Sequence, residues 1–178
     1  MQYSEIRFSG LGGQGIILTG YITGKAATIF DNLHATFVQS YGPESRGGAC
    51  SAQLIVSDKE VDYPLITKPD ILIVMSQEAY YKYAKELKPN GIMLVEEDMV
   101  KLENARTDVK ILKIPASKLA EKLGKRMVAN IVMLGFFTAQ AKTVSVKAMQ
   151  EAIKDSVPHG TEELNLKAFQ LGYDYKPS

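Results

Sequence analysis

The chain has 178 residues, a formal net charge of +1 and hydrophobic residues at 46% of its positions, so it can form one well-buried globular domain. Its Lys and Arg residues are scattered, which argues against the concentrated basic surface that sequence-independent nucleic-acid binding requires. No apolar run is long enough to cross a bilayer, and the opening residues, MQYSEIRFSG, do not resemble a signal peptide, so we expect a cytoplasmic protein without a membrane partner.

The chain has few residues that could hold a metal ion. Cys50 is the only cysteine, and the two histidines, His34 and His159, are far apart in the sequence. One cysteine can form neither an internal disulfide nor a cysteine-ligated iron–sulfur cluster or zinc site. We therefore expect no metal site in this chain, and any redox groups with which it works should lie on other chains. We also assign no catalytic residue to this chain.

Strands and helices are predicted to alternate along the chain. Predicted strands cover residues 3–8, 35–39, 50–56, 70–75, 92–95 and 109–114, and predicted helices cover 16–30, 77–87, 117–123, 128–142, 145–155 and 162–171. Residues 60–63 could return antiparallel after the turn at 57–59 as a hairpin arm, and Ser117 could cap its helix. The pattern predicts the α/β class, with a single three-layer, doubly wound, mostly parallel, Rossmann-like sheet, an antiparallel hairpin and C-terminal helices. We assign residues 1–178 to one domain.

A glycine-rich loop follows the first predicted strand. Residues 10–15, GLGGQG, fit the pattern G-x-G-x-x-G between a strand and a helix. Glycine tolerates positive φ and lets the backbone come close to a phosphate, while the free N–H groups of the following helix point at that phosphate. A phosphate-binding loop is thus one interpretation, and a tight turn that packs helix against strand without a ligand is the other.

The acidic residue expected in a dinucleotide site is missing. Such a site needs Asp or Glu after the second strand to bind a ribose hydroxyl, but that strand ends in Val38-Gln39-Ser40, and Asp31 precedes it. NAD is therefore disfavoured as the ligand.

A second loop, residues 40–48 (SYGPESRGG), follows the second predicted strand. Loops that leave the carboxyl ends of parallel strands share one edge of the sheet, so this loop should face the glycine loop. The planar guanidinium of Arg46 presents several N–H donors in an arrangement that suits phosphate oxygens. The alternative is a surface turn in which Glu44 and Arg46 form a weak, solvated pair.

Taken together, these motifs resemble the gamma subunit of 2-oxoacid:ferredoxin oxidoreductases. The resemblance rests on GLGGQGIILTG, SYGPESRGGACSAQLIVSD and DYPLITKPDILIVMSQEAYYKY, and it continues more loosely through residues 126–137 and the closing NLKAFQLGY. The combination of SYGPESRGG and MSQEAY is most similar to the 2-oxoglutarate branch of the family.

The resemblance implies a reaction that several chains share. A 2-oxoacid is activated by thiamine diphosphate and loses CO2, its electrons pass through [4Fe-4S] clusters to ferredoxin, and coenzyme A accepts the acyl group. In this family the alpha and beta subunits hold thiamine diphosphate, and beta or a small ferredoxin-like delta chain holds the clusters. The single cysteine of this chain is consistent with that division.

The resemblance also implies which residues contact coenzyme A. In the fused pyruvate enzymes, the equivalent domain closes over the coenzyme, with its glycine loop against the nucleotide phosphates. Carried over by position, the loop residues that would contact those phosphates are Gly12, Gly13, Gln14 and Gly15. Ser45 or Arg46 would stand where a basic residue reaches the coenzyme.

Asn130 is the third candidate site. It interrupts an otherwise apolar predicted helix and matches an asparagine in a related helix of the fused enzymes. A buried amide needs a hydrogen-bond partner, which could be the ligand or a neighbouring backbone group.

Two other functions stay open at this point. The chain could be an independent nucleotide-binding domain, which would bind and turn over its ligand without partners. It could also be a purely structural assembly subunit whose glycine loop binds nothing.

Overall fold

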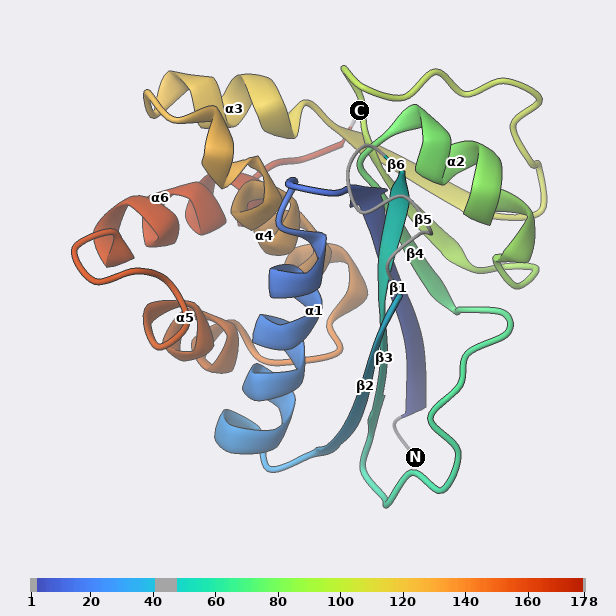
Figure 1. The fold of residues 1–178 in the computed structure, drawn as a ribbon, viewed down its shortest axis with the longest axis horizontal. Coiled ribbons are helices and arrows are strands. Elements are labelled where there is room, and N and C mark those ends of the chain that lie inside the picture. The colour runs from blue at the N-terminus through green and yellow to red at the C-terminus, as the bar shows by residue number, and fades with distance from the viewer. Residues whose placement is uncertain (1–2, 41–47, 178) are drawn as a thin grey trace.

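The computed structural model describes residues 3–40 and 48–177, in which six strands form one sheet in the order β2-β3-β1-β4-β5-β6 (Figure 1). The strands are β1 (Tyr3–Leu11), β2 (His34–Ser40), β3 (Ala49–Ser57), β4 (Ile71–Val74), β5 (Ile92–Glu96) and β6 (Lys110–Ile114). β1, β4, β5 and β6 are mutually parallel, whereas β3 runs antiparallel to both β1 and β2. This mostly parallel sheet with helices confirms the predicted fold class.

The helices cover the two faces of the sheet unequally (Figure 1). One face carries α1 (Ile16–Lys25) with its π-helical continuation η1 (Ala26–Phe30), α3 (Ala116–Lys122), η3 (Arg126–Val128), α4 (Ala129–Ala141), α5 (Val146–Lys154) and α6 (Glu162–Tyr173). The other face carries α2 (Gln77–Tyr83), followed by the 3-10 turn η2 (Ala84–Glu86). The larger hydrophobic core therefore lies between the sheet and the helices α1 and α4.

Alternating side chains of β1 divide between these two cores, as a strand covered on both faces requires. Ile6 and Phe8 belong to the larger core, where the ring of Phe8 packs edge-on against Phe137 of α4 at a centroid distance of 5.2 Å. Arg7 points to the opposite face, where its guanidinium lies 4.9 Å from the centre of the Tyr83 ring of α2. β4 is buried along its whole length, as its apolar run predicted.

Helix α4 packs tightly against α6 because two glycines face each other's backbone. A Cβ atom on Gly135 would lie 2.0 Å from the carbonyl oxygen of Phe169, and one on Gly172 would lie 1.8 Å from that of Val132. No side chain fits at either position, so these two glycines set the closest approach of the helices.

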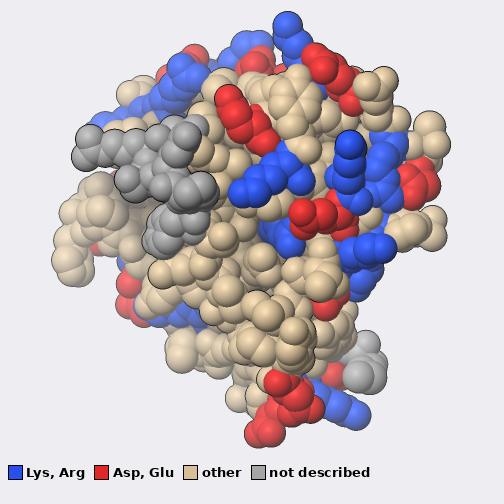
Figure 2. Space-filling view, turned by 45° about the vertical axis from the view of Figure 1, so that its right-hand side comes forward, with Lys and Arg blue, Asp and Glu red and all other residues tan. Residues whose placement is uncertain are grey.

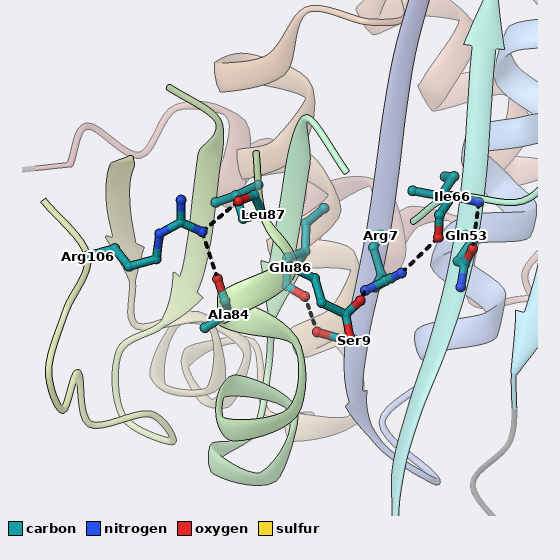
Figure 3. Close-up of polar contacts among 9 residues, drawn as sticks. Arg7, Ser9, Gln53, Ile66, Ala84, Glu86, Leu87 and Arg106 are labelled. Atoms are coloured by element: carbon teal, nitrogen blue, oxygen red, sulfur yellow. Dashed lines mark hydrogen bonds and ion pairs between the residues drawn. The ribbon is translucent and has the colours of Figure 1, made fainter. Parts of the chain in front are cut away.

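The predicted hairpin arm at residues 60–63 is wrong, because β3 forms its hairpin with β2 instead. The chain after β3 crosses the α2 face of the sheet, where two neighbouring strands hold Ile66 (Figure 3). Its N–H donates to Oε1 of Gln53 at 3.2 Å, and its carbonyl accepts from Nη2 of Arg7 at 3.2 Å. Arg7 and Gln53 are paired across β1 and β3. Side chains rather than a strand ladder therefore bind this segment, which also contains Pro64, a residue without an N–H.

The predicted cap at Ser117 is also wrong. α3 begins at Ala116, and Pro115 occupies the N-cap position without a side-chain hydrogen bond. Ser117 is buried in the first turn, and its N–H donates to Oε1 of Glu96 at 3.1 Å. An acidic side chain from β5 therefore takes over the capping role.

Charges of both signs are interspersed on the face drawn in Figure 2, beside a broad uncharged area. Ion pairs such as Lys88 with Asp70 and Arg106 with Asp108 fit this mixed pattern. None of the helices within residues 3–40 and 48–177 is long and apolar enough to cross a membrane.

Candidate ligand site at the glycine loop

The glycine loop connects β1 to α1 through two residues in a left-handed conformation. Gly13 has φ +92° and Gly15, the N-cap of α1, has φ +72°. Residues with a side chain avoid this region because the Cβ atom crowds the backbone. Gly10 is needed for a different reason, since a Cβ there would lie 2.5 Å from Oε1 of Gln14 and 2.7 Å from Cδ1 of Ile16.

Gln14 holds the loop together with its side chain. Its Oε1 accepts from the N–H of Leu11 at 2.7 Å, and its Nε2 donates to the carbonyl of Met75 at 3.0 Å. Met75 directly follows β4, so the amide ties the loop to the end of the neighbouring strand. Both ends of the Gln14 side chain are thus engaged within the protein.

Gly12 and Gly13 are exposed, and a Cβ atom on either would meet no described residue within 4 Å. The described part of the fold therefore leaves the space above these two glycines available to a ligand. No side chain of the described residues caps the first turn of α1, and that turn carries no acidic residue. Uncapped N–H groups at the positive end of a helix favour an anion such as a phosphate.

Asn130 lies directly over the last glycine of the loop. Its Nδ2 is 3.5 Å from the carbonyl oxygen of Gly15, at the outer limit for a hydrogen bond. The side chain is buried in the first turn of α4. The backbone partner considered from the sequence is thus present, but the contact is long.

A pocket of about 230 Å³ joins the glycine loop to the start of α4. The residues that line it come from the loop, from the segments that follow β4 and β5, from the first turn of α3, from η3 and from the start of α4; they are Gly13, Gln14, Met75, Met99, Ser117, Arg126, Met127, Ala129 and Asn130. Three of the predicted site residues therefore meet in one pocket, while Gly12 and Gly15 belong to the same loop. Larger hollows of about 480, 380 and 460 Å³ lie elsewhere, and none of their described lining residues is a predicted site residue.

Arg126 is the charged residue among the described residues of the pocket, and the sequence did not identify it as a site residue. Its side chain is 62% exposed, and its Nε is 3.7 Å from Oε1 of Glu121, which makes a weak surface pair. It precedes Asn130 by four residues, the spacing at which helical residues share one face. That spacing could have drawn attention to Arg126 once Asn130 was a candidate.

The second predicted loop, with Ser45 and Arg46, lies outside the described residues. Its flanking strands show where it starts and ends: Ser40 at the end of β2 pairs with Ser51 of β3, which also pairs with Ser9 of β1. The end of β2 therefore lies at the same edge of the sheet as the glycine loop. A ligand contact of Ser45 or Arg46 stays a prediction.

Cys50 is buried in β3, and burial raises the pKa of its thiol. A protonated, buried thiol behaves as a small apolar side chain rather than as a nucleophile or metal ligand. Cys50 is therefore a packing residue of β3.

Comparison with known proteins agrees with this fold and loop. The family model described as pyruvate ferredoxin/flavodoxin oxidoreductase matches residues 5–175. The 2-oxoglutarate synthase subunit KorC of Methanocaldococcus jannaschii is 51% identical over 172 residues, which cover 96% of this chain and 92% of the relative.

Two solved structures share the fold. The keto/oxoacid ferredoxin oxidoreductase gamma subunit from Geobacter sulfurreducens PCA superposes with a TM-score of 0.89 at 42% identity, covering 98% of this chain and 96% of that chain. A 2-oxoglutarate:ferredoxin oxidoreductase from Magnetococcus marinus gives a TM-score of 0.84 at 23% identity, covering 97% of this chain and 30% of that chain. With a matched family model, a half-identical relative and a gamma-subunit structure of nearly the same extent, this chain belongs to the pyruvate ferredoxin/flavodoxin oxidoreductase family, as a chain of its gamma type.

Proposed function

We propose that this chain is the gamma subunit of a 2-oxoglutarate:ferredoxin oxidoreductase and that its glycine loop and adjoining pocket bind the phosphate-bearing part of coenzyme A. The enzyme would oxidise 2-oxoglutarate to succinyl-coenzyme A and CO2, passing two electrons to ferredoxin. This chain would hold the coenzyme, while its partner subunits carry out the chemistry.

The proposal rests mainly on the charge of the residues that line the pocket. Among the nine described residues that line it, Arg126 is the single cation and none is acidic. The exposed backbone at Gly12 and Gly13 and the uncapped start of α1 lie beside it. A guanidinium and backbone N–H groups together form a typical site for phosphate oxygens.

The size of the pocket supports a site that is shared with partner subunits. Ligand clefts usually have volumes of about 300–1,000 Å³, whereas this pocket has about 230 Å³. It could take a phosphate group or one ring of a coenzyme, and the rest of the molecule would extend over the surface. The reactive thiol would then lie against another subunit.

Two related proteins support the choice of substrates. The half-identical relative is named a 2-oxoglutarate synthase subunit. The Magnetococcus marinus enzyme was solved with 2-oxoglutarate, coenzyme A and succinyl-CoA bound. By that likeness, 2-oxoglutarate is the 2-oxoacid that we propose.

The donor set of this chain does not fit an iron–sulfur cluster, because the sequence contains one cysteine and that thiol is buried. We therefore assign the clusters to the beta subunit or to a ferredoxin-like delta subunit, and by the family resemblance we assign thiamine diphosphate to the alpha and beta subunits. What this chain contributes is a phosphate site at the edge of a rigid sheet.

Replacing Arg126 by Ala in the assembled enzyme tests the proposal. Losing one charge-assisted hydrogen bond should raise the KM for coenzyme A about tenfold or more and leave the KM for 2-oxoglutarate unchanged. Lys125→Ala is the matched control, since Lys125 is exposed, adjacent in sequence and not part of the pocket. Equal coenzyme A kinetics in the two variants, or a shift in the 2-oxoglutarate KM, would contradict the proposal.

The same experiment, with the isolated chain assayed beside the assembled enzyme, separates the two alternative functions. An independent nucleotide-binding domain would bind and turn over a ligand without the partner subunits. A purely structural subunit would give an assembled Arg126→Ala enzyme with wild-type values of both KM constants.

A further inference from the structure

Glu96 is a buried carboxylate close to the pocket but not part of its lining. It is the last residue of β5 and is 0% exposed. On β5 the side chain of Leu94 belongs to the core beside α1 and α4, so Glu96, two residues further on, points to the same face. It therefore lies beneath the helices that surround the pocket.

Three of the pocket residues are neighbours of Glu96 in space or along the chain. Oε1 accepts from the N–H of Ser117 at 3.1 Å. The register pairs Val74 of β4 with Val95 of β5, which brings the next residues, Met75 and Glu96, side by side. Met99 follows three residues later in the turn after β5. Met75, Met99 and Ser117 all line the pocket, which places Glu96 directly behind its wall.

The carboxylate connects the turn after β5 with the start of α3. The N-cap of α3, Pro115, offers no side-chain acceptor, so Glu96 supplies one from a different element. A second contact joins the same two segments, because Lys118 of α3 pairs with Asp98 of the turn at 2.5 Å. That pair is exposed, since the Lys118 side chain is 69% accessible, and exposed pairs contribute little. The buried hydrogen bond from the Ser117 N–H to Glu96 is therefore the stronger of the two contacts.

The ionised form of Glu96 does not favour folding. Burial raises its pKa, and the N–H groups of Ser117, Met99 and Asp98 oppose that effect only in part. Its second oxygen, Oε2, has no hydrogen-bond partner among the described residues. A buried, half-satisfied carboxylate is costly, and an apolar residue of similar size often stabilises a protein more. A buried carboxylate that costs stability is expected where function requires it.

We propose that Glu96 is the positioning residue of the ligand pocket, holding Met99 and Ser117 at a fixed distance from the glycine loop. It does not touch the ligand. This inference rests on the function proposed above, because the effect that it predicts is on coenzyme A binding.

Two replacements of Glu96 test this role. Glu96→Leu removes the acceptor for the Ser117 N–H, whereas Glu96→Gln keeps an oxygen that can still accept it. Glu97→Leu is the control, because Glu97 is the next residue and is exposed. Two quantities are measured: amide hydrogen exchange at residues 97–99 and 116–118 of the full chain, and the KM and kcat of the assembled enzyme.

The positioning role predicts a specific pattern. In Glu96→Leu, exchange at these amides should be about tenfold faster and the KM for coenzyme A about tenfold higher, as expected when a bond to a charged group is lost. The kcat and the KM for 2-oxoglutarate should stay unchanged. Glu96→Gln should be close to wild type, and Glu97→Leu should change neither quantity.

Two outcomes overturn the proposal. If exchange in Glu96→Leu is unchanged, Glu96 does not fix these segments. If exchange is faster but the KM for coenzyme A is unchanged, the contact has no effect on binding. Gly12→Val, assayed in parallel, distinguishes this failure from that of the proposed function, because it fills the space at the loop without a clash with any described residue. A normal coenzyme A KM for Gly12→Val would refute the proposed function itself.

Discussion

Asn130 in the first turn of α4 contacts Gly15 at the start of α1, although the two residues are 115 positions apart in the sequence. The Asn130 amide reaches the Gly15 carbonyl at 3.5 Å, and a Cβ atom on Gly15 would lie 2.3 Å from the Asn130 Nδ2 atom. The start of α1 and the start of α4 therefore approach each other so closely that the glycine is required. Asn130 also lines the candidate pocket.

The contact between these two residues predicts a coupled pair of mutations. Gly15→Ala should destabilise the chain through its left-handed backbone, by about 1–2 kcal/mol, and further through the clash with Asn130. In an Asn130→Ala background only the backbone effect should remain, because the added Cβ would be 3.7 Å from the Cβ of residue 130, an ordinary contact. Denaturant unfolding of the two single variants and the double variant measures the difference. Strictly additive losses would show that the two residues do not constrain each other.

The packing of α4 on α6 predicts a large loss of stability from a single methyl group. Gly135→Ala and Gly172→Ala each place a Cβ within 2.0 Å of a carbonyl oxygen, which requires the helices to separate. Overpacking typically costs about 1–3 kcal/mol, and we expect these variants to lose at least that much in urea unfolding.

Gly24→Ala is the matched control for this prediction. Gly24 lies in the helix α1, and its added Cβ would meet only the flexible end of Leu54 at 3.2 Å. Since Ala favours a helix over Gly by about 1 kcal/mol, this variant should be neutral or stabilised. Similar stability of the Gly24 and Gly135 variants would contradict the described helix packing.

The buried carboxylate of Glu96 predicts an unusual pH dependence. Because burial raises its pKa in the folded state, the folded chain binds a proton more tightly than the unfolded chain does. The stability that Glu96 contributes should therefore fall as the pH rises through the interval between the ordinary and the raised pKa, and return as the pH falls.

Comparing the free energy of unfolding of the wild type with that of Glu96→Gln isolates this effect. The wild type should gain stability relative to Glu96→Gln when the pH is lowered from above the raised pKa to the ordinary range of Glu. If the wild type instead loses stability relative to the variant on acidification, the pKa of Glu96 is lowered and its ionised form is well satisfied.

The glycine loop was predictable from the sequence because the relevant signals are local. Positive φ at Gly13 and Gly15 and the step from β1 to α1 follow from glycine spacing and hydrophobic pattern over a short stretch. The buried run of β4 and the apolar helix around Asn130 were readable for the same reason.

Features that depend on distant contacts were not predictable. The hairpin arm at residues 60–63 was assigned from its turn, but Arg7 and Gln53 bind the following residues to the face of the sheet. Likewise, Ser117 was predicted to cap α3, whereas its own N–H donates to the carboxylate of Glu96. Glu96 is 21 residues earlier in the chain, and its position beside α3 cannot be predicted from the sequence.

The residues of the candidate site likewise divide into those that the sequence predicted and those that depend on distant contacts. Gly13, Gln14 and Asn130 were identified from the sequence and do meet in one pocket. The sequence could not indicate that both ends of the Gln14 side chain are used inside the loop, nor that Arg126 lies at the pocket. Both facts depend on how β4 and α4 are placed against the loop.

If the open space at the glycine loop receives a coenzyme A phosphate, Gly13→Val should block it. The valine would fill that space, but it would also strain a backbone with φ +92°. Gly160→Val reproduces the strain alone, because Gly160 has φ +84°, is equally open and is not part of the pocket.

The quantity to measure is the KM for coenzyme A of the two assembled variant enzymes, recorded beside thermal melts of the variant subunits. Phosphate binding at the loop predicts similar melting temperatures and assembly for both variants, with a KM for coenzyme A that rises at least tenfold, about the loss of one charge-assisted hydrogen bond, in Gly13→Val alone. A Gly13→Val enzyme that assembles and shows the same coenzyme A kinetics as Gly160→Val would contradict phosphate binding at this loop.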